Sequence, residues 1–266
     1  MSPTLPKPST PASLQPWRPV ALPPDSTAEE RLAAAAWEKH GATLGPLADE
    51  LGIPPADAVA VLCVESGGRG FGPDGRLLMR FENHVFWQRW GNKSPQNAER
   101  FYAHFRFDAG KKWTGHAYRL AEGIAPAGTN EWKEAHRGQA GEWEALGIAR
   151  AMEDTQALCS TSMGCAQLMG YHYARAGYGS VQEMFESFRA AETGERNQIT
   201  AMFRFVGGRA TSSDRSAARK AGSAMLDAIR RNDLVRFAEL YNGPGKAQEY
   251  AEKLRRIREA FARLSF

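Results

Sequence analysis

The sequence is divided into short segments by residues that start and stop helices. Residues 25–30 read Asp-Ser-Thr-Ala-Glu-Glu, which is typical of an N-cap followed by an acidic first turn. They predict a helix that runs to about His40 and stops at Gly41. Similar signals predict further helices at 43–51, 56–66, 84–90, 132–155 with a kink near 138–141, 167–176, 181–190, 193–207, 216–231, 233–241 and 245–264, and 91–128 is expected to be irregular.

One stretch, Arg-Leu-Leu-Met-Arg-Phe-Glu, follows a glycine-rich turn and alternates like a strand. Leu77, Met79 and Phe81 share its apolar face. Arg80 and Glu82 lie on the opposite, polar face. Many helices with one small β region predict an α+β fold that is mostly helical.

The first residues differ in composition from the rest of the chain. Residues 1–25 are rich in proline, serine and threonine, which cannot form a packed core and predict a flexible N-terminal arm. Residues 26–266 are expected to form one domain with its own core. The arm lacks the apolar segment of a signal peptide, and no stretch approaches the ~20 apolar residues of a membrane span. We therefore expect a chain made in the cytoplasm, without membrane insertion.

The charge of the chain is mildly basic, with a net charge of +4 and a pI near 9.0. This charge suits an anionic partner such as a cell wall, a nucleic acid or a membrane surface, and its sign does not choose among them. The sequence contains neither a nucleic-acid-binding motif nor a glycine-rich phosphate loop, so binding to nucleic acid is not expected.

The cysteines and histidines do not predict a disulfide framework or a metal centre. Cys63, Cys159 and Cys165 are expected to be reduced core residues, with a Cys159–Cys165 disulfide as the alternative. No histidine pair has the compact spacing of a motif such as HExxH, so neither a metal nor a cofactor is expected. The histidines of the aromatic-rich middle segment are His84, His104, His116 and His136.

Glu65 continues the apolar face of its expected helix. Ala58, Val61 and Leu62 precede it by seven, four and three residues, so all four side chains lie on one face. Burial and the negative end of the helix dipole both disfavour a carboxylate there, and both raise its pKa. A glycosidase needs this treatment of its general acid. The alternative is an exposed residue at the end of a core helix.

Three ordered blocks carry a resemblance to known enzymes. Residues 64–68, Val-Glu-Ser-Gly-Gly, resemble the catalytic Glu-Ser motif of goose-type lysozymes and lytic transglycosylases. Residues 162–169 and 238–245 resemble the Gly-x-x-Gln-x-Met and Ala-x-x-Tyr-Asn-x-Gly-Pro-Gly blocks of the same enzymes, the latter short by one residue. A closer resemblance over 45–264, carried by residues 78–84, 160–164 and 203–206, is to the N-acetylmuramidase domain of phage endolysins and of some bacterial wall-attacking effectors.

The resemblance implies a lysozyme-like fold with a small β-hairpin or sheet after the catalytic helix. It implies that Glu65 protonates the glycosidic oxygen, and that Gln167 lines the sugar cleft. Tyr241 would reach Glu65 or the substrate, and Asn242 would hold the local turn and contribute to substrate binding. Ser66 and Ser162 belong to the same blocks and are expected to bind substrate. Residue chemistry leaves two alternatives open: Tyr241 as a core aromatic, and Gln167 as a capping or network residue.

The second carboxylate of a hydrolase is expected to be Glu82. Its strand is expected to run back beside the end of the Glu65 helix, where Arg80 would keep Glu82 ionised and contribute to substrate binding. The alternative is a structural ion pair between Arg80 and Glu82. Lytic transglycosylases need a single glutamate, so a missing partner would not exclude cleavage.

The resemblance therefore implies a muramidase that cuts the β-1,4 bond between N-acetylmuramic acid and N-acetylglucosamine in bacterial peptidoglycan. It would serve phage-driven lysis or attack on other bacteria, acting in the periplasm or cell wall after delivery by a holin-type or secretion system. The alternatives are a lytic transglycosylase that leaves 1,6-anhydro ends, and an inactive module that only binds the wall. Many such endolysins carry a wall-binding domain ahead of the enzyme, where this chain has its proline-rich arm.

Overall fold

A computed structural model describes residues 20–66, 69–120, 131–208 and 217–264, with the backbone alone for Ser66 and 217–223. Its helices are α1 (Ala28–Leu51), α2 (Pro55–Ser66), α3 (Asn83–Arg89), α4 (Pro95–His104), α5 (Gln139–Met152), α6 (Asp154–Cys159), α7 (Val181–Arg189), α8 (Gly194–Gly207), α9 (Ala217–Arg230), α10 (Leu234–Asn242) and α11 (Ala247–Ala262). Its strands are β1 (Met79–Phe81), β2 (Phe105–Arg106), β3 (Ala117–Tyr118), β4 (Lys133–Glu134), β5 (Thr161–Met163) and β6 (Leu168–Met169). The expected class, mostly helical with small antiparallel sheets, is confirmed.

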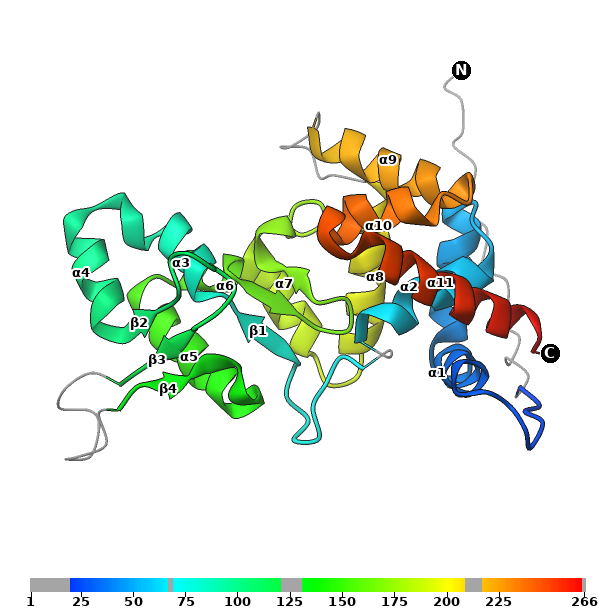
Figure 1. The fold of residues 1–266 in the computed structure, drawn as a ribbon, viewed down its shortest axis with the longest axis horizontal. Helices are drawn as coiled ribbons and strands as arrows, with labels where there is room; N and C mark the ends of the chain where they lie inside the picture. The colour runs from blue at the N-terminus through cyan, green and yellow to red at the C-terminus, as the bar shows by residue number, and fades with distance from the viewer. Residues whose placement is uncertain (1–19, 67–68, 121–130, 209–216, 265–266) are drawn as a thin grey trace, which may run out of the picture.

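The molecule has a helical half and a mixed half (Figure 1). In one half α2 packs between α1 and α11, and α8, α9 and α10 complete the layer around it. The other half contains α3, α4, α5 and the sheet formed by β2, β3 and β4. The sheet of β1, β5 and β6 lies between the two halves. None of the helices in the described part of the chain is long and apolar enough to cross a bilayer.

α1 is one helix where two were expected. Thr27 and Glu30 form a capping box at its start, and Gly52 ends it in the left-handed conformation with φ 60°. The expected stop at Gly41 is wrong, because Gly41 and Gly45 are buried inside the helix. A glycine costs a helix only about 1 kcal/mol, and the packing of this face against the rest of the helical half outweighs that cost.

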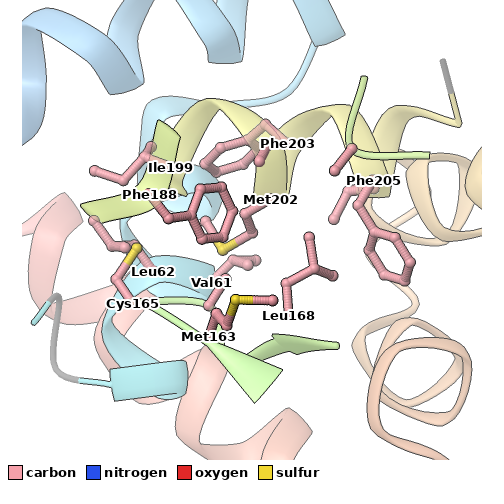
Figure 2. Packing of buried hydrophobic residues seen from close by; sticks show 14 of the residues in the cluster. Val61, Leu62, Met163, Cys165, Leu168, Phe188, Ile199, Met202, Phe203 and Phe205 are labelled. Carbon is pink, nitrogen blue, oxygen red and sulfur yellow. The ribbon is translucent and has the colours of Figure 1, made fainter. Parts of the chain in front are cut away.

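Almost every side of α2 is buried, and accordingly most of its residues are apolar. Val61 and Leu62 face Phe188 and Met202, and the β5–β6 hairpin adds Met163 to the same cluster (Figure 2). The core therefore fixes the C-terminal half of α2 relative to the hairpin.

The central sheet pairs β5 with β1 and with β6, all antiparallel. Strand structure expected over 76–82 is confirmed at 79–81, and Leu77 adds an isolated bridge to Phe71. A helix over 167–176 is wrong: β6 and a 3-10 turn at Gly170–His172 occupy its start. Gly170 lies so close to Leu158 that a Cβ would stand 2.0 Å from its carbonyl oxygen, so tertiary contact overrides local propensity there.

The segment expected to be irregular contains regular structure. α4 and strands β2 and β3 lie within 91–120, and residues 121–128 are outside the described part. The helix expected from residue 132 begins only at Gln139, because residues 133–134 pair with β3. The remaining expected helices are confirmed as α2, α3, α7, α8, α9, α10 and α11 within a few residues at their ends.

Cys63, Cys159 and Cys165 are free and buried, which confirms reduced thiols. Residues 1–19 of the expected arm lie outside the described part. The end of that arm is described, and there Val20 is buried and donates its N–H to Glu38 over 3.1 Å.

Candidate active site

Glu65 lies in the last turn of α2, where three helices meet. Tyr250 of α11 donates its hydroxyl hydrogen bond to Glu65 Oε1, and Asn242 at the end of α10 also hydrogen-bonds the carboxyl group. Burial raises the pKa of Glu65 to about 7, and the two hydrogen bonds act in the opposite direction because they stabilise the anion. The group is therefore set to hold and to give up a proton near neutral pH.

Tyr241 does not bond to Glu65, although the two side chains are close enough for the charge of Glu65 to affect it. Burial is the main cause that raises the pKa of Tyr241, and the Glu65 charge adds to it. Among the described residues its buried hydroxyl has no hydrogen-bond partner, and its ring lies 6.3 Å from that of Tyr250. The hydroxyl expected to reach Glu65 thus belongs to Tyr250, which the sequence argument missed. The spacing of α11 carried a signal, because Tyr250 lies on its buried face with Ala247.

A pocket of about 340 Å³ opens beside this group. Asn242 and Tyr250, the two partners of Glu65, both line it. The other lining residues are Gly245, Lys246, Glu249 and Lys253. Asn242 thus contacts the carboxyl group and lines the pocket, and its expected part in substrate binding stays a prediction.

The structure brings Arg80, Ser162 and Gln167 together on the central sheet. Ser162 lies opposite Arg80 in the β1–β5 register. Its hydroxyl donates to Gln167 Oε1 over 3.1 Å, and Gln167 Nε2 donates to the Gly164 carbonyl over 2.9 Å. Gln167 has φ 44°, a left-handed conformation that costs a non-glycine residue free energy. Gln167 therefore belongs to a hydrogen-bond network, as one alternative expected, and its role in lining the sugar cleft stays a prediction.

Gln198 of α8 holds this hairpin turn in place and was not predicted. Its buried amide oxygen accepts from Cys165 N over 2.8 Å, and its amide nitrogen donates to the Phe188 carbonyl over 2.9 Å. Burial raises the pKa of Cys165 to about 12, and the nearby charge of Glu65 contributes. The turn at Cys165 therefore lies near Glu65.

Glu82 lies in another cluster. Its Oε1 accepts from Arg80 Nε over 2.8 Å, and its Oε2 is 3.5 Å from Nδ1 of both His84 and His116. β1 does not run back beside the end of α2: it leads from there into the mixed half, where Glu82 precedes α3 (Figure 1). The expected Arg80–Glu82 pair exists, and the described contacts of Glu82 do not include Glu65. The side chain of Ser66 is outside the described part.

Two comparisons with known proteins bear on the family and the fold of the chain. The N-acetylmuramidase family model matches residues 54–264. The chain belongs to the N-acetylmuramidase family. A crystal structure of the Burkholderia AP3 phage endolysin is similar, with 27% identity and a TM-score of 0.59, over 91% of this chain and 74% of the endolysin chain. No curated protein matches the sequence.

Family membership makes this protein a glycoside hydrolase that acts on peptidoglycan, as the resemblance implied. The matched range includes α2, both hairpin strands, α10 and α11, and therefore every described residue around Glu65.

Proposed function

We propose that this muramidase cleaves the β-1,4 bond between N-acetylmuramic acid and N-acetylglucosamine, with Glu65 as its general acid. The observation that carries the proposal is a largely buried carboxyl group whose pKa lies at about 7. A general acid works best with a pKa near the working pH, because it must be protonated and still able to release the proton. An ordinary exposed glutamate, with a pKa near 4.3, would be ionised there.

The two hydrogen bonds to Glu65 fit the second half of the proton transfer. When Glu65 has protonated the leaving oxygen, it becomes a carboxylate that is still buried. Tyr250 and Asn242 then stabilise the anion, and hydrogen bonds to a charged group are each worth about 1.5–3 kcal/mol. Burial raises the energy of the anion while the donors limit that rise, so the pKa stays near neutrality.

The substrate-binding surface is proposed to combine the pocket beside Tyr250 with the polar face of the central sheet. Asn242 lines the pocket, and Arg80, Ser162 and Gln167 supply donors and acceptors on the sheet. Ser66 and Tyr241 are also proposed to bind substrate. Ser66 follows Glu65 in the chain, and Tyr241 is close enough for the charge of Glu65 to affect its pKa. Delivery to the wall by a holin-type or secretion system, in phage lysis or bacterial competition, remains part of the proposal.

The position of Glu82 favours a second candidate reaction. Hydrolysis with two carboxyl groups needs them about 5–9.5 Å apart, whereas the described contacts of Glu82 are with Arg80 and two histidines. Glu82 stays the proposed second carboxylate for hydrolysis. If Glu65 acts alone, the product would be the 1,6-anhydro end of a lytic transglycosylase.

The test uses purified peptidoglycan sacculi and the full chain. We expect wild type to release muropeptides, and Glu65→Gln to release them at least about 100-fold more slowly, because general acid catalysis contributes ~10²–10⁴-fold. Glu252→Gln, which changes an exposed carboxyl group of α11 that does not line the pocket, is the matched control and should keep its rate.

Mass spectrometry of the products separates the candidate reactions. Reducing ends support hydrolysis, and 1,6-anhydro ends support transglycosylation. A Glu65→Gln variant as active as wild type would remove Glu65 from the mechanism. Binding to sacculi without release of any fragment would leave only the wall-binding module.

A further inference from the structure

A second cluster of chemically active side chains lies away from Glu65, in the mixed half. It joins Glu82 and His84, at the start of α3, to His116, which directly precedes β3. One possible ligand atom from each residue lies within 4.8 Å of the other two. Glu82 and His84 are two positions apart, but His116 follows 32 positions later, so the three do not form a compact motif that the sequence pattern would indicate.

The distances within the cluster match the edges of a metal coordination shell. Glu82 Oε2 is 3.5 Å from His84 Nδ1 and 3.5 Å from His116 Nδ1. Zinc bonds to nitrogen and oxygen are about 2.0–2.2 Å long, so two ligands of a tetrahedral ion stand about 3.3–3.5 Å apart. The third edge is longer than ideal or comparable to it, since the three ligand atoms lie within 4.8 Å of one another and His84 Nδ1 is 3.3 Å from His116 Nε2. A rotation of the His84 ring would let the three atoms contact one ion.

Glu82 Oε2 lacks a hydrogen-bond partner in the described part of the chain, and a cation could take that place. The atom is buried and has no hydrogen-bond partner among the described residues, whereas Oε1 accepts from Arg80. A buried carboxylate oxygen without a donor is costly. Arg80 thus satisfies one oxygen and leaves the other facing the two imidazole rings.

The surroundings of the cluster have the arrangement usual around a metal site. His116 Nε2 is 2.8 Å from the Lys112 carbonyl oxygen, which can only accept, so Nε2 carries the proton and Nδ1 keeps its lone pair. Ligating histidines usually donate their other N–H to a carbonyl or carboxylate in this way, and ligating carboxylates are themselves hydrogen-bonded.

His136 and Glu142 extend the arrangement behind His116. His136 Nε2 is 2.7 Å from His116 Nδ1, and His136 Nδ1 is 2.8 Å from Glu142 Oε1. Glu142 Oε2 accepts from the backbone N–H of Phe81 in β1. A cation at His116 Nδ1 would therefore replace the contact between the two rings.

We propose that Glu82, His84 and His116 bind one divalent transition-metal ion of the zinc type, which ties the start of α3 to the loop before β3. Two imidazoles and one carboxylate suit such an ion better than Mg²⁺, which prefers oxygen ligands. The contacts of Glu82 lie in the mixed half rather than around Glu65, so the ion stabilises that half. With the ion bound, Glu82 is a ligand rather than a second carboxylate, and proton transfer rests on Glu65 alone.

The experiment titrates Zn²⁺ into the purified full chain, made without a polyhistidine tag and freed of metal with a chelator that is then removed. We expect one equivalent to bind with a Kd of about 1 µM or tighter in calorimetry. The melting temperature should rise with Zn²⁺ and stay unchanged with the same concentration of Mg²⁺.

Two variants and a matched control make the result specific. His84→Gln and Glu82→Gln change partly exposed residues, and each should weaken Zn²⁺ binding at least 10-fold and abolish the rise in melting temperature. His104→Gln also removes an imidazole but lies outside the cluster, where it contacts the Arg119 carbonyl, and should bind like wild type. Wild type that binds no Zn²⁺, or equal binding by the two cluster variants, would overturn the proposal.

Discussion

Burial and hydrogen bonding change the pKa of Glu65 in opposite directions. Burial acts first and raises the pKa from an ordinary value of 4.5 to about 7, while Tyr250 and Asn242 lower it. A carboxyl group that binds a proton more tightly in the folded state makes folding less favourable as the pH rises. The loss begins near pH 4.5, the unfolded value, and is complete above about pH 7.

This linkage predicts how Glu65→Gln changes stability. The amide has the same shape and no charge, so the variant avoids the cost of a buried anion. At pH 8 we expect it to be more stable than wild type by about 3 kcal/mol, since the pKa rises from 4.5 to about 7 and one pKa unit is 1.36 kcal/mol, and near pH 4.5 the two should match. Urea unfolding of both proteins at the two pH values measures the difference. Equal stability at pH 8 would show that Glu65 is not destabilised as an anion.

Tyr250→Phe tests the hydrogen bond that lowers the pKa of Glu65. Without the hydroxyl donor the carboxylate of Glu65 is less stable, so its pKa rises further and the acid stays protonated to higher pH. We expect the alkaline limb of the pH profile of kcat/KM to move up by about one unit, and the maximal rate to fall several-fold. Tyr102→Phe, which changes an exposed tyrosine, should keep the wild-type profile. A profile that falls without shifting would indicate a structural role alone.

The site was predictable where its residues belong to local sequence blocks. Glu65 stood out because it continues an apolar helix face, and Gln167 because it lies in the block that resembles Gly-x-x-Gln-x-Met. Tyr250 and Gln198 reach the site only through the packing of α11 and α8. The sequence predicted Glu82 beside Glu65, whereas its described contacts are with Arg80 and two histidines. The direction that a strand takes after a turn depends on tertiary packing, and the alternation of apolar residues along the strand does not determine it.

At the scale of elements, the β5–β6 hairpin depends on a close approach to α8. Gly164 has φ 72°, and a Cβ there would lie 2.6 Å from the Gln198 amide. Gly75 has nearly the same conformation, φ 73°, with nothing within 4 Å. The pair separates left-handed strain, which both share, from steric overlap, which only Gly164 has.

We expect Gly164→Ala to lower the free energy of unfolding by about 3 kcal/mol, and Gly75→Ala by about 1 kcal/mol. Gly164→Ala should also reduce cleavage of sacculi, because it displaces the turn that carries Gln167. Urea denaturation and a sacculus assay at a temperature where both variants are folded measure these effects. Equal losses in the two variants would mean that Gln198 yields to the new methyl group and does not anchor the hairpin.

The elements that the sequence predicted well are those whose own periodicity is long. α7, α8, α10 and α11 have an amphipathic pattern over nine or more residues. The sheet of β2, β3 and β4 was missed, because each strand is two residues long and no period can be recognised in so few positions. Such strands form because segments that are distant in the sequence pair with each other. α1 likewise continues through Gly41 because of tertiary contacts that the local sequence does not show.

For the whole molecule, charge sets the encounter with the substrate. The chain has 34 basic and 30 acidic residues, and thus a net charge of +4. Peptidoglycan is anionic through the carboxylates of its peptides, so attraction should concentrate the enzyme on the wall. The Debye length is about 10 Å at 0.1 M salt and about 3 Å at 1 M, so added salt removes this attraction while buried groups such as Glu65 are screened much less.

We therefore expect the rate on intact sacculi to fall several-fold between 50 mM and 500 mM NaCl, through KM more than kcat. The rate on a neutral chitin oligosaccharide, if it is cleaved, should change by less than about twofold, because only the long-range attraction is lost. Initial rates on both substrates at constant pH measure the contrast. A parallel fall on both would place the salt effect in the active site itself, where the hydrogen-bonded carboxyl of Glu65 would be the group to examine.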